Sequence, residues 1–249
     1  MKTFSFLILS LSLCLPAIAS DDTIFIFAVK HDHFWGSGTG DLAIDQEGIT
    51  YSSETDNDHA THWSYSDIQE LKIESPRKIY IRTYQDVGWK FNRDRTFEFD
   101  VVERDIDTQV VDFLRESLPT QLVSAVFTPP HNVAYAVPAK HQHALGGGCH
   151  GELVWSEEGV YYNTSESEHS RFWAIEDIES LGRMSRFKIR FTVREHSHSG
   201  SIRNFQFQLK GPMDDGIYQQ LWRRIYEPKS WLTQPSIGGQ AIQSPDQAQ

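Results

Sequence analysis

The chain contains very little cysteine, and this limits how its fold can be stabilised. Of 249 residues only two are cysteines, and Cys14 lies in an N-terminal apolar stretch that we expect to be removed. Cys149 would then remain alone, which excludes an intramolecular disulfide. A lipid-modified Cys14 is the alternative, which Leu13 disfavours because that modification needs a small residue before the cysteine. The fold must therefore depend on apolar burial.

Long apolar runs are absent after the N-terminus. Phe4 to Leu15 form one such run, with Lys2 before it and Ala17-Ile18-Ala19 after it. This order is typical of a secretory signal peptide, so we expect residues 1–19 to be a signal that is cleaved after Ala19. No later segment reaches the roughly 20 apolar residues of a membrane-spanning helix. We therefore expect a secreted or periplasmic protein with no transmembrane segment after signal cleavage.

Basic residues are also few, with 23 Lys and Arg against 34 Asp and Glu and a formal net charge of -11. Such an acidic chain is poorly suited to nucleic acid, so we expect no nucleic-acid partner. Nucleophiles and bases show no recognisable catalytic arrangement, so we expect no enzyme and no catalytic residues. Residues 229–249 are rich in Gly, Gln, Ser and Pro without apolar periodicity, and we expect a disordered tail there.

What the chain does contain is an internal repeat. The segment AVKHDHFWGSGTGDLAIDQEGITY, from Ala28, matches AVPAKHQHALGGGCHGELVWSEEGVYY, from Ala136. In three of the matches the two residues are 110 positions apart: His31 and His141, Trp63 and Trp173, and Phe97 and Phe207. So many matches in one order predict two copies of a single domain.

Each copy combines strand periodicity with a closing helical segment. Ile79 and Ile81 alternate with Lys78 and Tyr80, which is typical of a half-buried antiparallel strand. Hairpin turns with a positive-φ glycine are expected at Gly48 and Gly159. The helical positions are Val110, Phe113 and Leu114, then Ile217, Leu221, Trp222 and Ile225, with N-caps at Asp107 and at Asp214 or Asp215. This predicts an α+β, mainly β fold of two tandem β-barrels, each closed by a C-terminal α-helix.

Both copies share the same order of short motifs. It runs G-x-L, a turn glycine in E-G-[IV], W-x-[YI]-x-D-I-x-x-L, a [KR]-I-x-I-type strand, an F-x-F strand and a final helix. This order resembles the pleckstrin-homology-like superfold in its bacterial and GRAM-like forms. The resemblance implies PH-like domain 1 at residues 23–119, a linker at 120–132 and PH-like domain 2 at 133–228. Barrels of this kind usually recognise partners, which implies a binding module.

The most unusual repeated motif is K-H-x-H, at residues 30–33 and 140–143. Residues i and i+2 of a strand share a face, so two imidazoles could reach one metal ion. The candidate ligands are His31, His33, His141, His143, Cys149 and His150. The alternative is that the histidines hydrogen-bond the glycine-rich turn after the first strand, in which case no cofactor is expected. Cys149 and His150 are neighbours, which on a strand would point them to opposite faces.

A local basic stripe is the second candidate site. It consists of Arg186, Lys188, Arg190 and Arg194, and it could meet an acidic partner or lipid head groups. The alternative is that these residues form the solvated face of a strand. Phosphoinositide binding is not implied, because the first loop of each copy carries no basic residue.

These observations predict an exported, non-catalytic binding or scaffolding protein. Its partner would be a protein or another component of the cell envelope. A zinc-binding protein that uses the repeated histidines is the alternative function.

Overall fold

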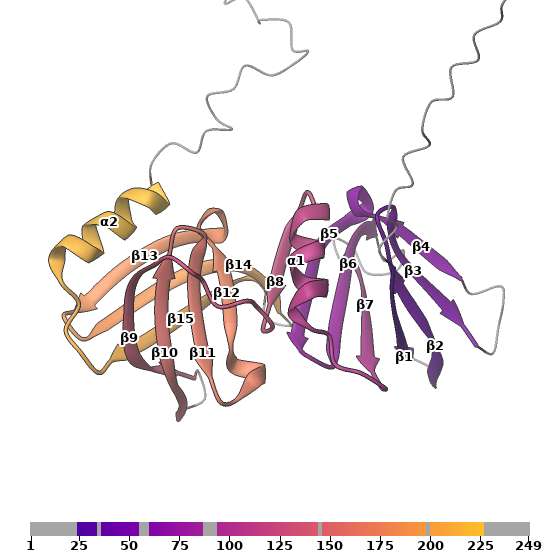
Figure 1. The fold of residues 1–249 in the computed structure, drawn as a ribbon, viewed down its shortest axis with the longest axis horizontal. Helices are drawn as coiled ribbons and strands as arrows, with labels where there is room; N and C mark the ends of the chain where they lie inside the picture. Colours follow the sequence, from indigo (N-terminus) through magenta and orange to yellow (C-terminus); the bar gives the residue numbers. More distant parts are fainter. Residues whose placement is uncertain are drawn as a thin grey trace, which may run out of the picture.

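The computed structural model describes residues 24–33, 36–54, 60–86, 94–143, 146–197 and 200–226. Within these ranges there are fifteen β-strands and two α-helices (Figure 1). The signal expected at residues 1–19 and the tail expected at residues 229–249 lie outside the described residues. Each α-helix follows a group of strands, as the repeat predicts.

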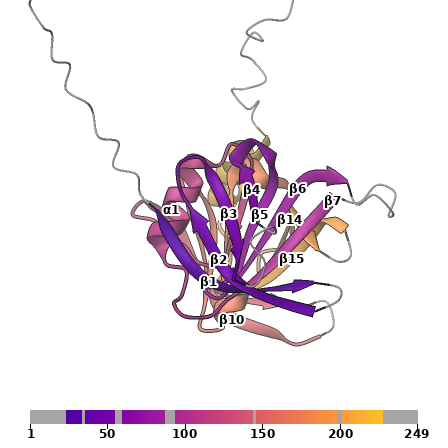
Figure 2. The same ribbon diagram turned by 90° about the vertical axis from the view of Figure 1, so that its right-hand side faces the viewer.

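The first half contains seven strands and the helix α1. Its elements are β1 (Phe25–His33), β2 (Gly36–Ile44), β3 (Gly48–Ser53), β4 (Thr61–Ser64), the 3-10 helix η2 (Tyr65–Asp67), β5 (Ile68–Ser75), β6 (Lys78–Asp86), β7 (Asp94–Val101) and α1 (Thr108–Ser117). Because β1 pairs with both β2 and β7, the strands have the order β5-β6-β7-β1-β2-β3-β4. Figure 2 shows these strands splayed around their core, with α1 at one side.

The second half repeats this arrangement. Its elements are β9 (Val133–Gln142), β10 (Gly148–Ser156), β11 (Gly159–Thr164), η3 (Ser167–His169), β12 (Arg171–Ala174), η4 (Ile175–Asp177), β13 (Ile178–Ser185), β14 (Lys188–Ser197), β15 (Gly200–Leu209) and α2 (Asp215–Tyr226). The strand order is β13-β14-β15-β9-β10-β11-β12. This is the strand order of the first half, with each strand replaced by its equivalent in the second half.

The two halves are not separate closed barrels, which corrects the fold class expected from the sequence. All fifteen strands form one open sheet whose two ends are β13 and β4, and no closed barrel occurs among the described residues. The chain is mostly β, with two α-helices within the described ranges. The predicted pairing that would close each half is therefore absent from that part of the chain.

The strand β8 (Gln121–Ser124) explains why the sheet stays open. It lies in the expected linker and pairs in parallel with β5, where Gln121 is opposite Glu70. Its other edge pairs with β12, where Ser124 is opposite Phe172. To close, the first half would need β5 beside β4, and the second half would need β12 beside β13. Because β8 occupies those edges of β5 and β12, it joins the halves into one sheet instead.

Strand pairing also corrects one detail of the repeat. Ile79 is opposite Phe99 in the first half, whereas Ile189 is opposite Phe207 in the second. The structural equivalent of Phe207 is therefore Phe99, 108 positions earlier, and the predicted match with Phe97 is wrong by two residues. The reason is that the second copy has two residues fewer between these paired positions, which a motif match cannot detect.

Each half has its own buried cluster. The first cluster lies between residues 27 and 118 and the second between residues 137 and 225. Trp63 and Trp173 are 1% and 2% exposed, and each packs on two phenylalanines of one strand, β7 for Trp63 and β15 for Trp173. Both tryptophans are therefore core residues at equivalent positions of the repeat. A third, smaller cluster of Val154, Tyr161 and Phe172 lies in the second half, and Phe127 of the connecting segment packs against it.

The turn glycines are required for steric reasons more than for their φ angles. Gly48 has a φ of 157°, but Gly159 has no positive φ, contrary to the expectation. A Cβ atom would lie 2.1 Å from the carbonyl oxygen of Trp63 at Gly48, and 2.2 Å from that of Trp173 at Gly159. At both turns the close approach of the neighbouring strand excludes a side chain.

The expected helix caps are present. The Asp107 carboxylate accepts hydrogen bonds from the backbone N–H groups of Gln109 and Val110 at the start of α1. Asp214 does the same for Gly216 and Ile217 at the start of α2, so Asp214 rather than Asp215 is the cap. These carboxylates satisfy amide groups that no helical carbonyl can reach.

Asp107→Ala should lower the free energy of unfolding by about 1 kcal/mol, the usual cost of losing an N-cap. Chemical denaturation of both proteins measures this difference. Asp105→Ala is the control, because Asp105 makes a solvent-exposed ion pair with Arg77. A change as small as that of the control would contradict the capping role of Asp107.

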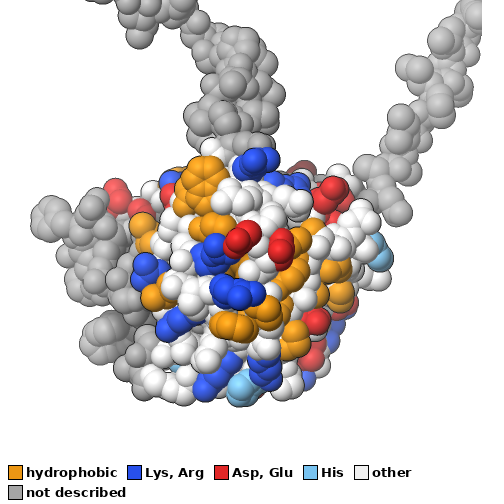
Figure 3. Space-filling model, turned by 90° about the vertical axis from the view of Figure 1, so that its left-hand side faces the viewer, with side chains coloured by type: hydrophobic (Ala, Val, Ile, Leu, Met, Phe, Trp, Pro, Cys, Tyr) orange, Lys and Arg blue, Asp and Glu red, His pale blue; other side chains and the backbone are white. Residues whose placement is uncertain are grey.

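The end of the molecule beside α2 has a mixed surface. Figure 3 shows this face, on which hydrophobic side chains lie between basic ones. Trp222 has helical spacing with the buried residues of α2, but it is 43% exposed and contacts the ring of Tyr226, with ring centroids 4.7 Å apart. Leu221 and Ile225 are the buried residues of α2, and they pack in the core of the second half.

Candidate metal centre

The second K-H-x-H motif lies where β9 meets β10. His141 is directly opposite Cys149 in this antiparallel pair, so both side chains point to the same face. That face is the interior, where Cys149 is 1% exposed and its neighbour Ala139 is fully buried. His143 follows immediately after β9, at the same end of the sheet.

Three potential metal ligands converge at this point. One ligand atom each from His141, His143 and Cys149 lies within 4.8 Å of the other two. The Cys149 Sγ to His141 Nδ1 distance is 3.9 Å. In a tetrahedral zinc site with ordinary bond lengths this separation would be about 3.6 Å. Small side-chain rotations would therefore bring the three atoms to ligand distance.

A fourth imidazole lies beside the cluster. The ring of His169, in η3, is 4.5 Å from the ring of His143 between centroids. His169 Nδ1 is 2.8 Å from a carboxylate oxygen of Glu166, which leaves Nε2 as the ring nitrogen available to another group. The Nε2 atom of His143 is buried and has no hydrogen-bond partner among the described residues. A carboxylate that orients a histidine in this way is common around protein-bound metals.

The protonation states suit metal coordination in part. Burial, together with the nearby His143 and His169, lowers the pKa of His141 to about 4. At neutral pH the imidazole is therefore uncharged and has a lone pair available. Burial raises the pKa of the Cys149 thiol, although a hydrogen bond with Tyr162 opposes this effect. A metal ion would have to displace the thiol proton.

The equivalent position in the first half is built differently. His31 is opposite Gly38, so a glycine stands where the second half has Cys149. The Nδ1 atom of His31 is 2.8 Å from the backbone carbonyl oxygen of Glu98, and the ring stacks on Phe99 at 4.7 Å. This histidine is a core residue, but the hydrogen bond is made to β7, whereas the alternative interpretation expected the glycine-rich turn. The side chain of His33 lies outside the described residues.

His150 is not part of the cluster. It is exposed on the opposite face of β10, as expected for a residue that follows an inward-facing Cys149. His169 and Glu166 were not among the sequence candidates. Their Glu-x-x-His spacing in a polar loop could have indicated them, but it is too common to be specific.

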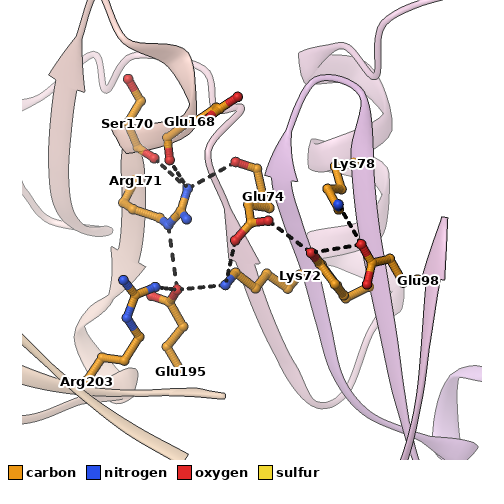
Figure 4. A network of polar contacts seen from close by, with 10 residues as sticks. Lys72, Glu74, Lys78, Glu98, Glu168, Ser170, Arg171, Glu195 and Arg203 are labelled. Atoms are coloured by element: carbon orange, nitrogen blue, oxygen red, sulfur yellow. Dashed lines mark hydrogen bonds and ion pairs between the residues drawn. The ribbon is translucent and has the colours of Figure 1, made fainter. Parts of the chain in front are cut away.

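A buried charge network lies beside this site, where the two halves meet (Figure 4). Glu195 is fully buried, and one of its oxygens is 3.2 Å from Lys72 Nζ of the first half and 3.7 Å from Arg171 Nε. Arg203 makes a further ion pair with the same oxygen. Arg171 also donates to the backbone carbonyl of Glu74, across the junction. The network therefore ties β14 and β12 of the second half to β5 of the first.

The predicted basic stripe lies on the outer face of β14 and the turn before it. Arg186, Arg190 and Arg194 are exposed and Lys188 is half-buried. Arg194 makes an ion pair with Glu179, at 2.5 Å between Nε and Oε1. The stripe is therefore partly neutralised at one end, while Lys188 and Arg190 have no ion-pair partner in the described part of the chain.

A groove of about 1360 Å³ separates the halves on another side. Its lining includes Arg82 and Arg115 as well as Glu158 and Glu176, with Tyr226 at its edge. Because both signs of charge line it, charge alone does not select a ligand there.

Among the described residues, no helix has the length and apolar character needed to span a membrane. No protein-family model matches the chain, and no curated protein matches it. Among solved structures it is similar to the one described as "Structure of the Spt16D Pob3N heterodimer", with 10% identity over 76% of this chain and 98% of that chain. The TM-score is 0.30, so this likeness carries no argument about function.

Proposed function

We propose that this protein binds a transition metal ion, zinc or copper, through His141, His143 and Cys149. The observation that carries the proposal is the convergence of three ligand atoms within 4.8 Å of one another. They come from the two paired strands and the residue after β9, so the sheet itself holds them in place. Sites on paired strands are more rigid than sites on loops.

The chemistry of the ligands restricts the ion. Thiolate and imidazole groups favour zinc and copper, whereas calcium and magnesium require oxygen ligands. Three protein ligands leave one coordination position open. His169, held by Glu166, is the imidazole beside the cluster that could fill it.

The broader expectation of an exported binding protein remains part of the proposal, with the metal ion as its ligand. The seven strands and one helix of each half support the resemblance to PH-like domains. A secreted or periplasmic location is likewise proposed on the signal sequence. No catalytic role is proposed for the site.

Titration of the chelator-treated protein tests the metal site. Isothermal titration calorimetry with Zn²⁺ should give one ion per chain, and Co²⁺ should give a thiolate-to-metal charge-transfer absorption. Cys149→Ser should abolish that absorption and weaken Zn²⁺ binding by more than about 100-fold, since even outer-shell changes cost 10–100-fold. His143→Ala should weaken binding comparably.

Two histidine variants are matched controls. His150→Ala removes the exposed neighbour of Cys149, and His31→Ala removes the equivalent of His141 in the first half. Both should bind one Zn²⁺ ion as the unaltered protein does. Stoichiometric binding that survives Cys149→Ser, or an absence of stoichiometric binding in the unaltered protein, would refute the proposal.

A further inference from the structure

The outer face of the second half carries a row of polar side chains across four strands. Strand pairing places Lys188 of β14 opposite Gln208 of β15, Gln208 opposite Lys140 of β9, and Lys140 opposite His150 of β10. Residues directly opposite each other share a face of the sheet. That face is the outer one, because His150 and Gln208 are exposed.

A second row lies beside the first. Arg190 is opposite Gln206, which is opposite Gln142, and the two glutamine side chains are hydrogen-bonded to each other. We call the two rows together the basic platform. Its members are Lys140, Gln142, His150, Lys188, Arg190, Gln206 and Gln208.

The basic platform contains cations and amides but no carboxylate. Within the described residues, neither Lys140 nor Lys188 has an ion-pair partner within 4 Å, although other lysines of the chain do. The outward carboxylate nearest to it along β10 is Glu152, which is opposite Pro138 and so lies beyond the row. Positive charge is therefore left unbalanced here in a chain whose net charge is -11.

The first half provides an internal comparison. There Lys78 is opposite Asp100, and Asp100 is opposite Lys30. Lys78 Nζ is 2.5 Å from a carboxylate oxygen of Glu98 and 3.6 Å from one of Asp100. The same face of the first half is therefore neutralised by its own carboxylates.

The two halves differ at these positions by the replacement of carboxylates with amides. Because Phe207 is the equivalent of Phe99, Gln208 stands where the first half has Asp100. By the same register Gln206 stands where it has Glu98. Both halves have the two lysines, but the carboxylates that pair with Lys78 in the first half are amides at the equivalent positions of the second half.

From this difference we infer that the basic platform binds an acidic polysaccharide. Neighbouring strands lie about 4.8 Å apart, so Lys140 and Lys188, two strands apart, are separated by about 10 Å along a flat row. Such spacing suits a linear chain that carries an anionic group at intervals. The glutamine amides between the lysines both donate and accept hydrogen bonds, which suits sugar hydroxyl groups.

Other polyanions fit the basic platform less well. A single-stranded nucleic acid is usually held by aromatic side chains that stack on its bases, and the basic platform has none. An anionic membrane surface is usually bound with apolar side chains that enter the lipid, and these are also missing from the two rows. The inference does not depend on metal binding, because the metal ligands lie on the opposite face.

Heparin and polygalacturonate are suitable probes, with uncharged dextran as the control. Calorimetry should show that the full chain binds both acidic polysaccharides but not dextran, and that added NaCl weakens the binding. The double variant Gln206→Glu, Gln208→Asp introduces the carboxylates of the first half. It should weaken binding by about tenfold or more, because like charges then face the polysaccharide.

The reciprocal double variant changes the first half. Glu98→Gln with Asp100→Asn removes both ion-pair partners of Lys78, so this variant should bind more heparin per chain than the unaltered protein. Thermal melting by circular dichroism shows whether both variants are folded, and all four substitutions are at surface positions. Failure of this variant to gain binding would contradict the role assigned to the carboxylates.

Three further results would overturn the inference. One is heparin binding that the Gln206→Glu, Gln208→Asp variant retains in full. Another is tighter binding to phosphatidylglycerol vesicles than to either polysaccharide, which would assign the surface to a membrane. The third is that single-stranded DNA binds the unaltered protein as tightly as heparin does, and that the Gln206→Glu, Gln208→Asp variant weakens both equally. That result would show a general polyanion site.

Discussion

Glu195→Ala should lower the free energy of unfolding by about 3–5 kcal/mol, the usual cost of removing one partner from a buried ion pair. Glu195 is fully buried, and it faces Lys72, Arg171 and Arg203. Its removal leaves two cations in a nearly water-free environment, since the Lys72 and Arg171 side chains are 10% and 6% exposed. Glu74 would compensate Lys72 in part, because their charged groups are 3.3 Å apart.

Chemical denaturation at pH 7 measures this loss, and Glu179→Ala is the matched control. Glu179 also pairs with an arginine of β14, but the two side chains are 39% and 70% exposed. Exposed pairs contribute little, so the control should cost less than about 1 kcal/mol. Similar losses for the two variants would show that the buried network has no special role.

The same network predicts how stability depends on pH. Burial alone would raise the pKa of Glu195, but Arg171, Arg203 and Lys72 lower it below the ordinary value of 4.5. A carboxyl group with a lowered pKa stabilises the folded state above its unfolded pKa. That contribution is lost as the pH falls through the lowered value. The stability difference between the unaltered protein and Glu195→Ala should therefore shrink below about pH 4.5, and a constant difference would contradict this assignment.

Trp173→Ala should also be severely destabilising, by about 3–5 kcal/mol. The indole is 2% exposed and packs on Phe191 and Phe205, with ring centroids 4.9 Å and 4.6 Å away. Truncation would leave a cavity at the centre of the second cluster. Thermal or urea unfolding followed by circular dichroism measures the loss.

Trp222→Ala is the matched control in the same half. Its indole is 43% exposed and contacts Tyr226 on the outer side of α2, so its removal should cost about 1 kcal/mol or less. If the two variants were equally stable, the assignment of Trp173 to the core of the second half would be wrong.

Local periodicity was sufficient to predict most of the strands and both helices. The alternation at Ile79 and Ile81 and the cap at Asp107 depend on neighbours a few residues away, which the sequence displays directly. The sequence left open whether Trp222 of the second helix is buried or exposed. Periodicity identifies an apolar side chain on a helix, but it does not tell whether another element covers it.

The candidate site was predicted in part. The spacing of K-H-x-H and the position of Cys149 indicated three groups that the structure brings together. The contribution of His169 and Glu166 depends on the fold that brings His169 beside His143, which no specific local pattern indicates. The difference between His141 and His31 depends on the residue opposite each of them, Cys149 or Gly38, and therefore on strand register.

The sequence alone determined that the chain repeats one unit of strands and a helix, and that both copies have a tryptophan at the equivalent position. These features follow from local alternation and from matches within the chain. Only the tertiary structure decided that β8 joins both copies into one open sheet, and that Glu195 of one half meets Lys72 of the other. A free strand edge pairs with a neighbouring strand, and a buried charge pairs with an opposite charge close to it in space. The two members of each pair are far apart along the chain, so local sequence patterns do not reveal them.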